Sequence, residues 1–280
     1  VTVLERLRAR GLAEGSATTP EEGDIPIYPL GSGSDYSPFL QHAGISSLNL
    51  SFGGESSGGS YHSVFDSFEH YTRFGDTDFA YGVTLAKVAG RATLRLANAE
   101  MLPFRFETFV GHVADYADEV EALADKMREE TAKHNKLVES GVYELSYDPQ
   151  GGIAPPAVKS PVPHISFAVV HNAVEDLRVT SGAADKAVAG AVASPELNKL
   201  LARLERSMAS DDGLPRRPWF RHQIYAPGYY TGYGVKTLPG IREAIEERKW
   251  EEADEQMIRV AATLTRISDA FRDIAKEASK

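Results

Sequence analysis

Two long apolar stripes in the second half of the chain restrict its fold most strongly. One is formed by Phe109, Val113, Tyr116, Val120, Leu123 and Met127, at steps of 4, 3, 4, 3 and 4 residues. The other is formed by Met257, Val260, Leu264, Ile267, Phe271 and Ile274, at steps of 3, 4, 3, 4 and 3. Such spacing keeps apolar side chains on one face of an α-helix. We therefore predict two long helices here, each of which must bury its apolar face.

The residues between these stripes predict two further helices. Residues 165–190 are rich in Ala and Val, and Leu197, Leu200, Leu201, Leu204 and Met208 follow a helical spacing. Ser194-Pro195 is a helix start, because Ser is a favoured N-cap and Pro fits the first turn. Pro-rich residues 149–163 and an aromatic stretch at 213–240 read as connections. We expect residues 104–280 to form a helical bundle.

Residues 1–103 follow a different pattern. Apolar residues 25–30 contain two prolines, which confine a strand to a sheet edge. A glycine-bearing turn at 31–36 precedes a short helix that starts at Ser37-Pro38 and stops at Gly44. Residues 45–52 then read as a strand, and residues 76–99 as a largely buried helix. This order is typical of an α/β sheet, so we predict an α/β domain over 1–103 followed by an all-α domain over 104–280.

Charge and composition exclude several functions. Thirty basic and forty acidic residues give a net charge of −10, which argues against nucleic-acid partners. No run reaches the roughly 18 apolar residues of a membrane helix, so we expect no membrane span. Cysteine is absent, which removes disulfides, thiolate metal ligands and cysteine nucleophiles.

Histidine is the strongest single candidate for chemistry. The chain has eight histidines, none in a self-contained metal motif. His62 stands out because it follows the glycine-rich residues 53–60 and is flanked by Tyr61 and Ser63. Loops of this kind often carry functional groups, yet a lone histidine is more often structural or exposed. On local pattern alone, both interpretations stay open.

Several longer segments bear a family resemblance. They are Ile-Tyr-Pro-Leu-Gly-Ser-Gly-Ser-Asp-Tyr at 27–36 with Phe-Leu-Gln-His-Ala-Gly-Ile at 39–45, Tyr-His-Ser-Val-Phe-Asp-Ser-Phe-Glu at 61–69, Leu-Ala-Asn-Ala-Glu-Met-Leu-Pro-Phe at 96–104, Gly-Leu-Pro-Arg-Arg-Pro-Trp-Phe-Arg-His-Gln-Ile-Tyr-Ala-Pro at 213–227 and Pro-Gly-Ile at 239–241. In this order they resemble the zinc exopeptidases related to glutamate carboxypeptidase and the transferrin receptor. The resemblance runs from about residue 20 to the end of the chain.

The resemblance implies specific roles. His62 matches the last ligand of a two-zinc (Zn) site, a role open to a neutral imidazole. Tyr61 matches a tyrosine that hydrogen-bonds the substrate carbonyl as charge develops on its oxygen. Gly33 and Ser34 match a turn that lines the substrate pocket, and Tyr233 matches a tyrosine that contacts the substrate's C-terminal residue. The helices after residue 104 fall where the family has its dimerisation domain, which implies a homodimer with a peptide substrate.

Other positions depart from the glutamate carboxypeptidase pattern. Ser34 replaces an Asn, Asn49 and Ser51 replace two arginines, and Gly232 replaces a Lys. Those cations pair with acidic groups of the substrate through charge-assisted hydrogen bonds. We therefore expect no strict glutamate specificity. A neutral or broader peptide substrate, cleaved by a carboxypeptidase or an aminopeptidase reaction, fits better.

The family's other zinc ligands and its Glu general base have no counterpart here. We therefore expect this chain to be the C-terminal part of a longer two-zinc metallo-exopeptidase and to be inactive by itself. One alternative is a non-catalytic dimerisation or binding module of the transferrin-receptor kind, although His62 argues against it. Another is a dimeric helical protein complete at this length. The resemblance also suggests a periplasmic or extracellular location.

Overall fold

The computed structural model describes residues 2–13, 28–53, 59–146, 154 and 156–280. The chain divides into two compact units, residues 1–30 and 31–280. In the first unit, helix α1 (Val3–Ala13) leaves Leu4 and Leu7 exposed. The second unit holds the other elements and the main core. No helix in the described ranges is long and apolar enough to span a membrane.

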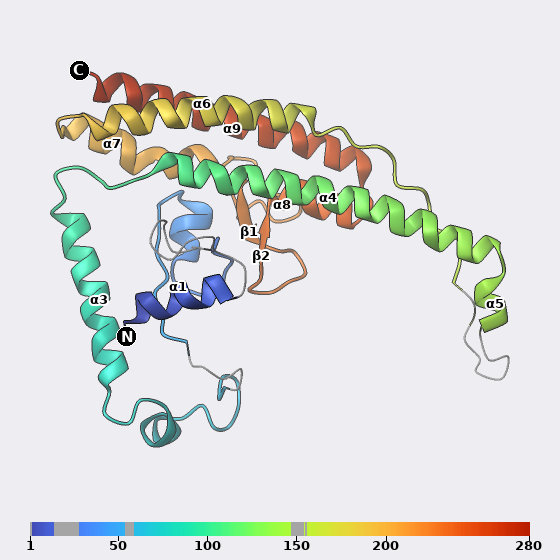
Figure 1. Ribbon diagram of the computed structural model, residues 1–280, viewed down its shortest axis with the longest axis horizontal. Helices are drawn as coiled ribbons and strands as arrows, with labels where there is room; N and C mark the ends of the chain where they lie inside the picture. Colours follow the sequence, from blue (N-terminus) through green and yellow to red (C-terminus); the bar gives the residue numbers. More distant parts are fainter. Residues whose placement is uncertain (1, 14–27, 54–58, 147–153, 155) are drawn as a thin grey trace. The chain divides into compact units, whose positions relative to one another are not determined.

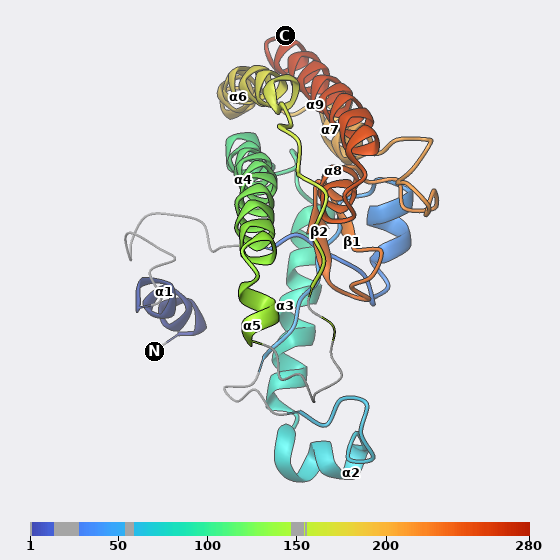
Figure 2. The same ribbon diagram turned by 90° about the vertical axis from the view of Figure 1, so that its right-hand side faces the viewer.

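Three long helices form the centre of the second unit. They are α4 (Phe106–Glu139), α6 (Ala168–Ala189) and α9 (Trp250–Ala278). Helix α6 packs along α9, and α4 packs against α6. Helix α4 runs in one direction, whereas α6 and α9 both run in the other (Figures 1 and 2). The helices predicted in these parts of the chain are confirmed. The short helix α5 (Val142–Ser146) follows α4.

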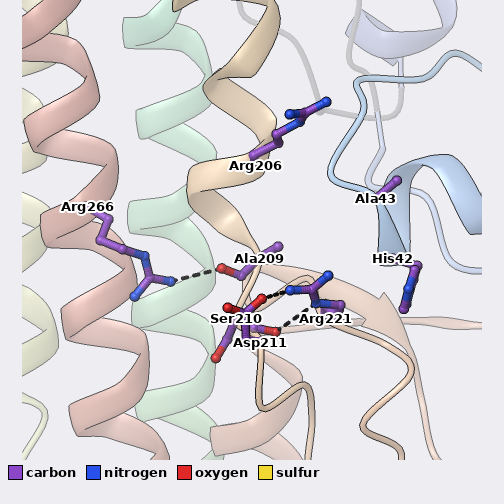
Figure 3. Close-up of a pocket in the computed structure, with 8 residues that line it drawn as sticks. All are labelled: His42, Ala43, Arg206, Ala209, Ser210, Asp211, Arg221 and Arg266. Carbon is purple, nitrogen blue, oxygen red and sulfur yellow. Dashed lines mark hydrogen bonds and ion pairs between the residues drawn. The ribbon is translucent and has the colours of Figure 1, made fainter.

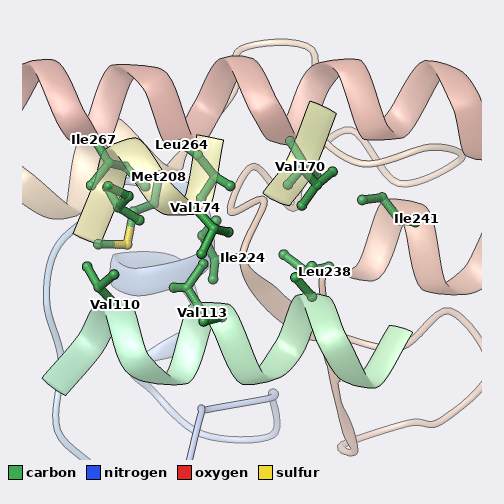
Figure 4. Close-up of a cluster of buried hydrophobic side chains, with 14 of the residues drawn as sticks. Val110, Val113, Val170, Val174, Met208, Ile224, Leu238, Ile241, Leu264 and Ile267 are labelled. Carbon is green, nitrogen blue, oxygen red and sulfur yellow. The ribbon is translucent and has the colours of Figure 1, made fainter. Parts of the chain in front are cut away.

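The residues of the two apolar stripes form much of the core of this bundle. All six residues of the 257–274 stripe are buried. In the 109–127 stripe, Val113 and Val120 are fully buried and the other four residues pack partly buried against the core. The ring of Phe271 on α9 lies 4.9 Å from that of Phe106 at the start of α4. Figure 4 shows the core side chains meeting between the helices.

Shorter elements close the bundle. Helix α7 (Pro195–Arg203) continues into the 3-10 helix η3 (Leu204–Met208), and both pack on α9, as does α8 (Pro239–Glu246). The predicted start of α7 is confirmed, because the Ser194 hydroxyl accepts the Leu197 N–H at 3.0 Å. Residues 213–240, predicted as a connection, also contain a hairpin. Its strands β1 (Tyr225–Pro227) and β2 (Val235–Thr237) pair antiparallel, with Ala226 opposite Lys236.

Residues 31–103 match the α/β prediction only locally. The short helix η1 (Pro38–His42) is present, and Gly44 follows it with a positive φ of 63° as predicted. The strand predicted over residues 45–52 is wrong for this structure, since the segment is irregular. A strand forms only on a partner backbone, and in the described ranges β1 and β2 make the only sheet. The α/β part of the predicted fold is therefore not confirmed.

The helix predicted over residues 76–99 is present but not buried. After α2 (Phe68–His70) and η2 (Tyr71–Gly75), helix α3 (Ala80–Ala97) buries none of its 18 residues. Tyr81 and Leu94 are each 64% exposed. The apolar composition of α3 predicts burial, but no other element of the described chain covers this helix.

Candidate functional site

Three segments far apart in the sequence carry the predicted site residues. Residues 31–34 and 232–234 lie against each other. The Ser32 N–H donates to the Tyr233 carbonyl at 3.3 Å. Gly33 has a φ of +92°, and a Cβ at that position would stand 2.5 Å from the Tyr233 ring. A side chain at residue 33 would therefore collide with the ring and strain the backbone. Only glycine at position 33 allows the predicted pocket turn to pack against the Tyr233 ring.

The third segment is a tight turn that presents Tyr61 and His62. Its backbone closes through the Ser63 N–H, which donates to the Ser60 carbonyl at 2.9 Å. His62 has a φ of +59°, in the left-handed region where non-glycine residues are uncommon. Its ring stacks on that of Tyr61, with centroids 3.9 Å apart. Both side chains are exposed and open to a ligand.

Tyr61 joins this turn to Tyr233. The two phenol groups interact electrostatically, and both rings remain largely exposed. The pKa of the Tyr61 phenol lies above its ordinary value, through partial desolvation and then through this interaction with Tyr233. Tyr61 is therefore protonated at neutral pH and can donate a hydrogen bond. We call Gly33, Tyr61, His62 and Tyr233 the tyrosine–histidine cluster.

Two further observations concern Ser34 and the zinc ligands. Ser34 has an exposed side chain, and its backbone carbonyl accepts the Ser37 N–H at 3.0 Å. Across the residues that the structure describes, no three His, Cys, Asp or Glu side chains are placed to hold a metal ion. A catalytic zinc needs about three protein ligands. The described residues of this chain therefore do not fit a complete zinc site, and His62 could supply only one ligand.

A buried carboxylate forms a polar group that the sequence did not reveal. The Glu205 carboxylate accepts from the Ser46 hydroxyl at 2.9 Å and from the Tyr225 hydroxyl at 3.1 Å. His222 Nε2 lies 3.0 Å from the same carboxylate, while its Nδ1 accepts the Tyr225 N–H at 3.2 Å. Because Nδ1 accepts, the proton belongs on Nε2, which donates to Glu205. The group ties the 45–52 segment to η3 and β1.

The electrostatics of this group favour an ionised Glu205. Burial by itself raises the pKa of the carboxyl, but the hydrogen bonds from His222, Ser46 and Tyr225 lower the pKa by more than burial raises it. Burial and the neighbouring carboxylate raise the pKa of Tyr225 well above its ordinary value. In the sequence, the only signal for this group is the Arg-His-x-Ile-Tyr segment at 221–225. Residue spacing alone could not pair His222 with Glu205, which lies 17 residues before it.

Comparison with known proteins gives the family. Residues 165–272 match the transferrin receptor-like dimerisation domain. A probable glutamate carboxypeptidase, LAMP1, from Arabidopsis thaliana is 33% identical over 85% of this chain and 31% of its own length. A probable glutamate carboxypeptidase from Arthroderma benhamiae is 29% identical over 87% of this chain and 30% of its own length. The aminopeptidase NAALADL1 from Rattus norvegicus is 25% identical over 90% of this chain and 33% of its own length.

The chain belongs to the transferrin receptor-like peptidase family. Its matched dimerisation domain begins just before α6 and ends within α9, so it includes α7, α8 and the hairpin between them. The tyrosine–histidine cluster takes Tyr233 from this domain and its other three members from residues before it. The chain spans about a third of the length of the curated relatives that it matches.

Proposed function

We propose that this chain is part of a two-zinc exopeptidase, to which it supplies one zinc ligand and one wall of the substrate pocket. The observation that carries the proposal is the tyrosine–histidine cluster, in which residues from three separate segments meet at an exposed surface. Relatives named as glutamate carboxypeptidases and as an aminopeptidase support a peptide substrate. His62 would be the ligand, and zinc would supply Lewis-acid chemistry when bound.

The other members of the cluster would act on the substrate. The Tyr61 hydroxyl, kept protonated by its raised pKa, would donate a hydrogen bond to the substrate carbonyl oxygen as negative charge grows on it. Tyr233, held by the Gly33 turn, would contact the substrate's terminal residue, and Ser34 would line the same turn. Because the described residues lack a complete ligand set, we expect no hydrolysis by this chain alone.

The same pocket wall favours a neutral or broad peptide substrate. At the positions where glutamate carboxypeptidase has arginine or lysine, this chain has Asn49, Ser51 and Gly232, none of which carries a charge. Recognition of an acidic side chain would lose its charge-assisted hydrogen bonds. We therefore propose kcat/KM values that differ little between acidic and neutral dipeptides. Carboxypeptidase and aminopeptidase modes both stay open.

The helical domain is proposed to form a homodimer. Its match to a domain named for dimerisation supports this proposal. The alternative function is a non-catalytic dimerisation or binding module of the transferrin-receptor kind. The observation that favours this alternative is that the matched family model is a dimerisation domain.

The deciding experiment starts from the native protein. An antibody against α9 isolates the protein from its source, and its intact mass is compared with the 30.5 kDa of this chain. The isolated protein is then assayed for bound zinc and for cleavage of a panel of dipeptides. His62→Ala and Tyr61→Phe variants of the same protein separate metal binding from substrate contact.

A larger mass is expected, with two zinc ions and peptidase activity. His62→Ala should lose zinc together with activity, whereas Tyr61→Phe should keep the zinc and lose about 10²-fold or more in kcat. A larger protein without zinc, in which His62→Ala changes nothing, would favour the non-catalytic module. A native mass near 30.5 kDa would overturn the exopeptidase proposal and leave a helical dimer.

A further inference from the structure

The loop that carries Tyr233 is anchored near its start by a buried carboxylate. Residues 228–234 join β1 to β2, and they are exposed from Tyr229 onward. The Tyr229 N–H donates to Glu243 Oε1 at 2.7 Å. Glu243 belongs to α8, in which every residue but the last is buried. An exposed loop is therefore attached to a buried element of the bundle.

Arg217 completes this anchor. Its Nη2 donates to Glu243 Oε1 at 3.0 Å and its Nη1 lies 2.9 Å from Oε2, and both side chains are less than a tenth exposed. A pair joined at two points fixes the orientation of the carboxylate. The Tyr229 ring also lies 5.8 Å from the Arg217 guanidinium and 5.5 Å from that of Arg216. Tyr229 is thus held through its main chain and through its side chain.

The segment that carries Arg217 is itself fixed at its base. The Ser210 N–H donates to the Arg221 carbonyl at 2.8 Å, and Arg221 Nε donates to the Ser210 carbonyl at 3.3 Å. Figure 3 shows the Arg221 guanidinium joined to Ser210 and to the Asp211 carboxylate, in the wall of a cavity of about 420 Å³. The Arg221 N–H also donates to the Gln41 carbonyl at 2.7 Å. Arg217 therefore reaches Glu243 from a fixed position.

The 228–234 loop is compact, so its two ends are coupled. The Gly234 carbonyl accepts the Gly228 N–H at 2.9 Å and the Thr231 hydroxyl at 2.8 Å. A Cβ at Gly228 would lie 2.2 Å from Thr231 Oγ1, which shows how closely the loop is folded on itself. We expect a displacement of Tyr229 to move Tyr233 as well.

We propose that the buried Arg217–Glu243 pair is a positioning pair, which acts through Tyr229 to hold Tyr233 beside the Tyr61 turn. This inference rests on the proposed exopeptidase function, in which Tyr233 contacts the terminal residue of the peptide. When the anchor is weakened, fewer molecules have the loop in place, and the apparent affinity for the peptide falls in proportion. The chemical step depends on other residues and keeps its rate, so the effect belongs in KM.

Steady-state peptidase kinetics on the native protein test the proposal. The variants are Glu243→Gln, which removes the charge of the anchor, and Tyr229→Ala, which removes only an exposed ring. Glu255→Gln makes the first change at an exposed position of α9, and Tyr229→Phe keeps the ring beside the two guanidinium groups. Ultraviolet difference titration, with a Tyr61→Phe protein as the reference, follows the pKa of the Tyr61 phenol in each variant.

KM should rise at least about threefold in Glu243→Gln and in Tyr229→Ala, with kcat within about twofold of the wild type. In both variants the pKa of Tyr61 should fall toward its ordinary value, because Tyr233 contributes to raising it. Glu255→Gln and Tyr229→Phe should match the wild type. If Glu243→Gln does not fold, Tyr229→Ala decides the result.

A purely structural role would reduce the active fraction of the protein, so that kcat falls while KM stays the same. That result overturns the proposal, as does a Tyr229→Ala protein that matches Tyr229→Phe in KM or in the Tyr61 titration. A wild-type protein that cleaves no peptide would overturn the exopeptidase function. The titration would then decide by itself whether the pair positions Tyr233.

Discussion

Replacing the buried Glu205 by Gln should destabilise the protein in a pH-dependent way. The carboxylate accepts hydrogen bonds from Ser46, His222 and Tyr225. Hydrogen bonds to a charged group contribute about 1.5–3 kcal/mol each, and a buried partner left unsatisfied costs about 1–3 kcal/mol. A Gln keeps the shape and one acceptor oxygen, but it places an NH₂ group where the second oxygen accepted. We expect a loss of about 2–4 kcal/mol in the free energy of unfolding at pH 7.5.

The sign of the pH dependence follows from the lowered pKa of Glu205. A folded-state pKa below the unfolded value, which is about 4.3 for Glu, means that the folded protein favours the ionised form. Its contribution to stability is fully present above the unfolded pKa and is lost as the pH falls through the folded pKa. The stability gap between wild type and Glu205→Gln should therefore be largest at pH 7.5 and shrink below about pH 4.5.

Urea unfolding followed by circular dichroism at pH 7.5, 5.5 and 4.0 measures this gap. Glu255→Gln is the control, because Glu255 is an exposed residue of α9 that makes the same change of charge. A Glu205→Gln protein within about 0.5 kcal/mol of the Glu255→Gln protein at pH 7.5 would refute the reasoning, since surface substitutions stay within that range. A gap that does not change with pH would refute the role of the charge.

Three further changes test the core, a helix cap and the tyrosine–histidine cluster. Phe271→Ala removes a ring with 0% exposure and should cost about 3–5 kcal/mol in urea unfolding. Asp185→Ala removes the carboxylate of α6 that accepts the first two N–H groups of α4 at 2.8–3.0 Å, and should cost about 1–2 kcal/mol in the same assay. Gly33→Ala should push Tyr233 away from Tyr61, so that the pKa of the Tyr61 phenol, followed by ultraviolet difference titration, falls toward its ordinary value.

Each of these changes has a matched control. Phe271→Leu keeps most of the buried volume and should lose less than half as much stability as Phe271→Ala. Asp185→Asn keeps one acceptor oxygen for α4 and should lie between Asp185→Ala and the wild type. Gly53→Ala places a methyl group where nothing lies within 4 Å, so it should leave the Tyr61 titration unchanged. Equal effects in a variant and its control would contradict the proposed contact.

Periodicity was enough to predict the helical bundle because its long helices bury one face each. The stripe from Met257 to Ile274 is buried along its whole length in α9. The same kind of reasoning failed for residues 45–52 and for α3. Alternation and apolar content show which side chains a segment could bury, but they do not show whether another strand or helix is present to cover them. A strand needs a neighbouring backbone, and an apolar helix needs a surface.

Part of the candidate site was within reach of sequence reasoning and part was not. The residues matched to the exopeptidase family, Tyr61, His62, Gly33 and Tyr233, do lie together, but their proposed roles are untested. The position of Ser34 in the turn could be predicted, but not that its side chain is exposed. The Glu205 group depends on contacts between distant segments, which no local pattern records.

The exposed helix α3 determines where a protease would first cut this chain. Helix α3 buries none of its 18 residues, and in proteins most of the stability of a helix comes from packing its apolar face against other elements. We therefore expect α3 to open more often than α9, whose apolar residues are buried in the core. Trypsin at low concentration should therefore cleave first at Lys87, Arg91 or Arg95, and should release a long-lived fragment that contains α4 to α9.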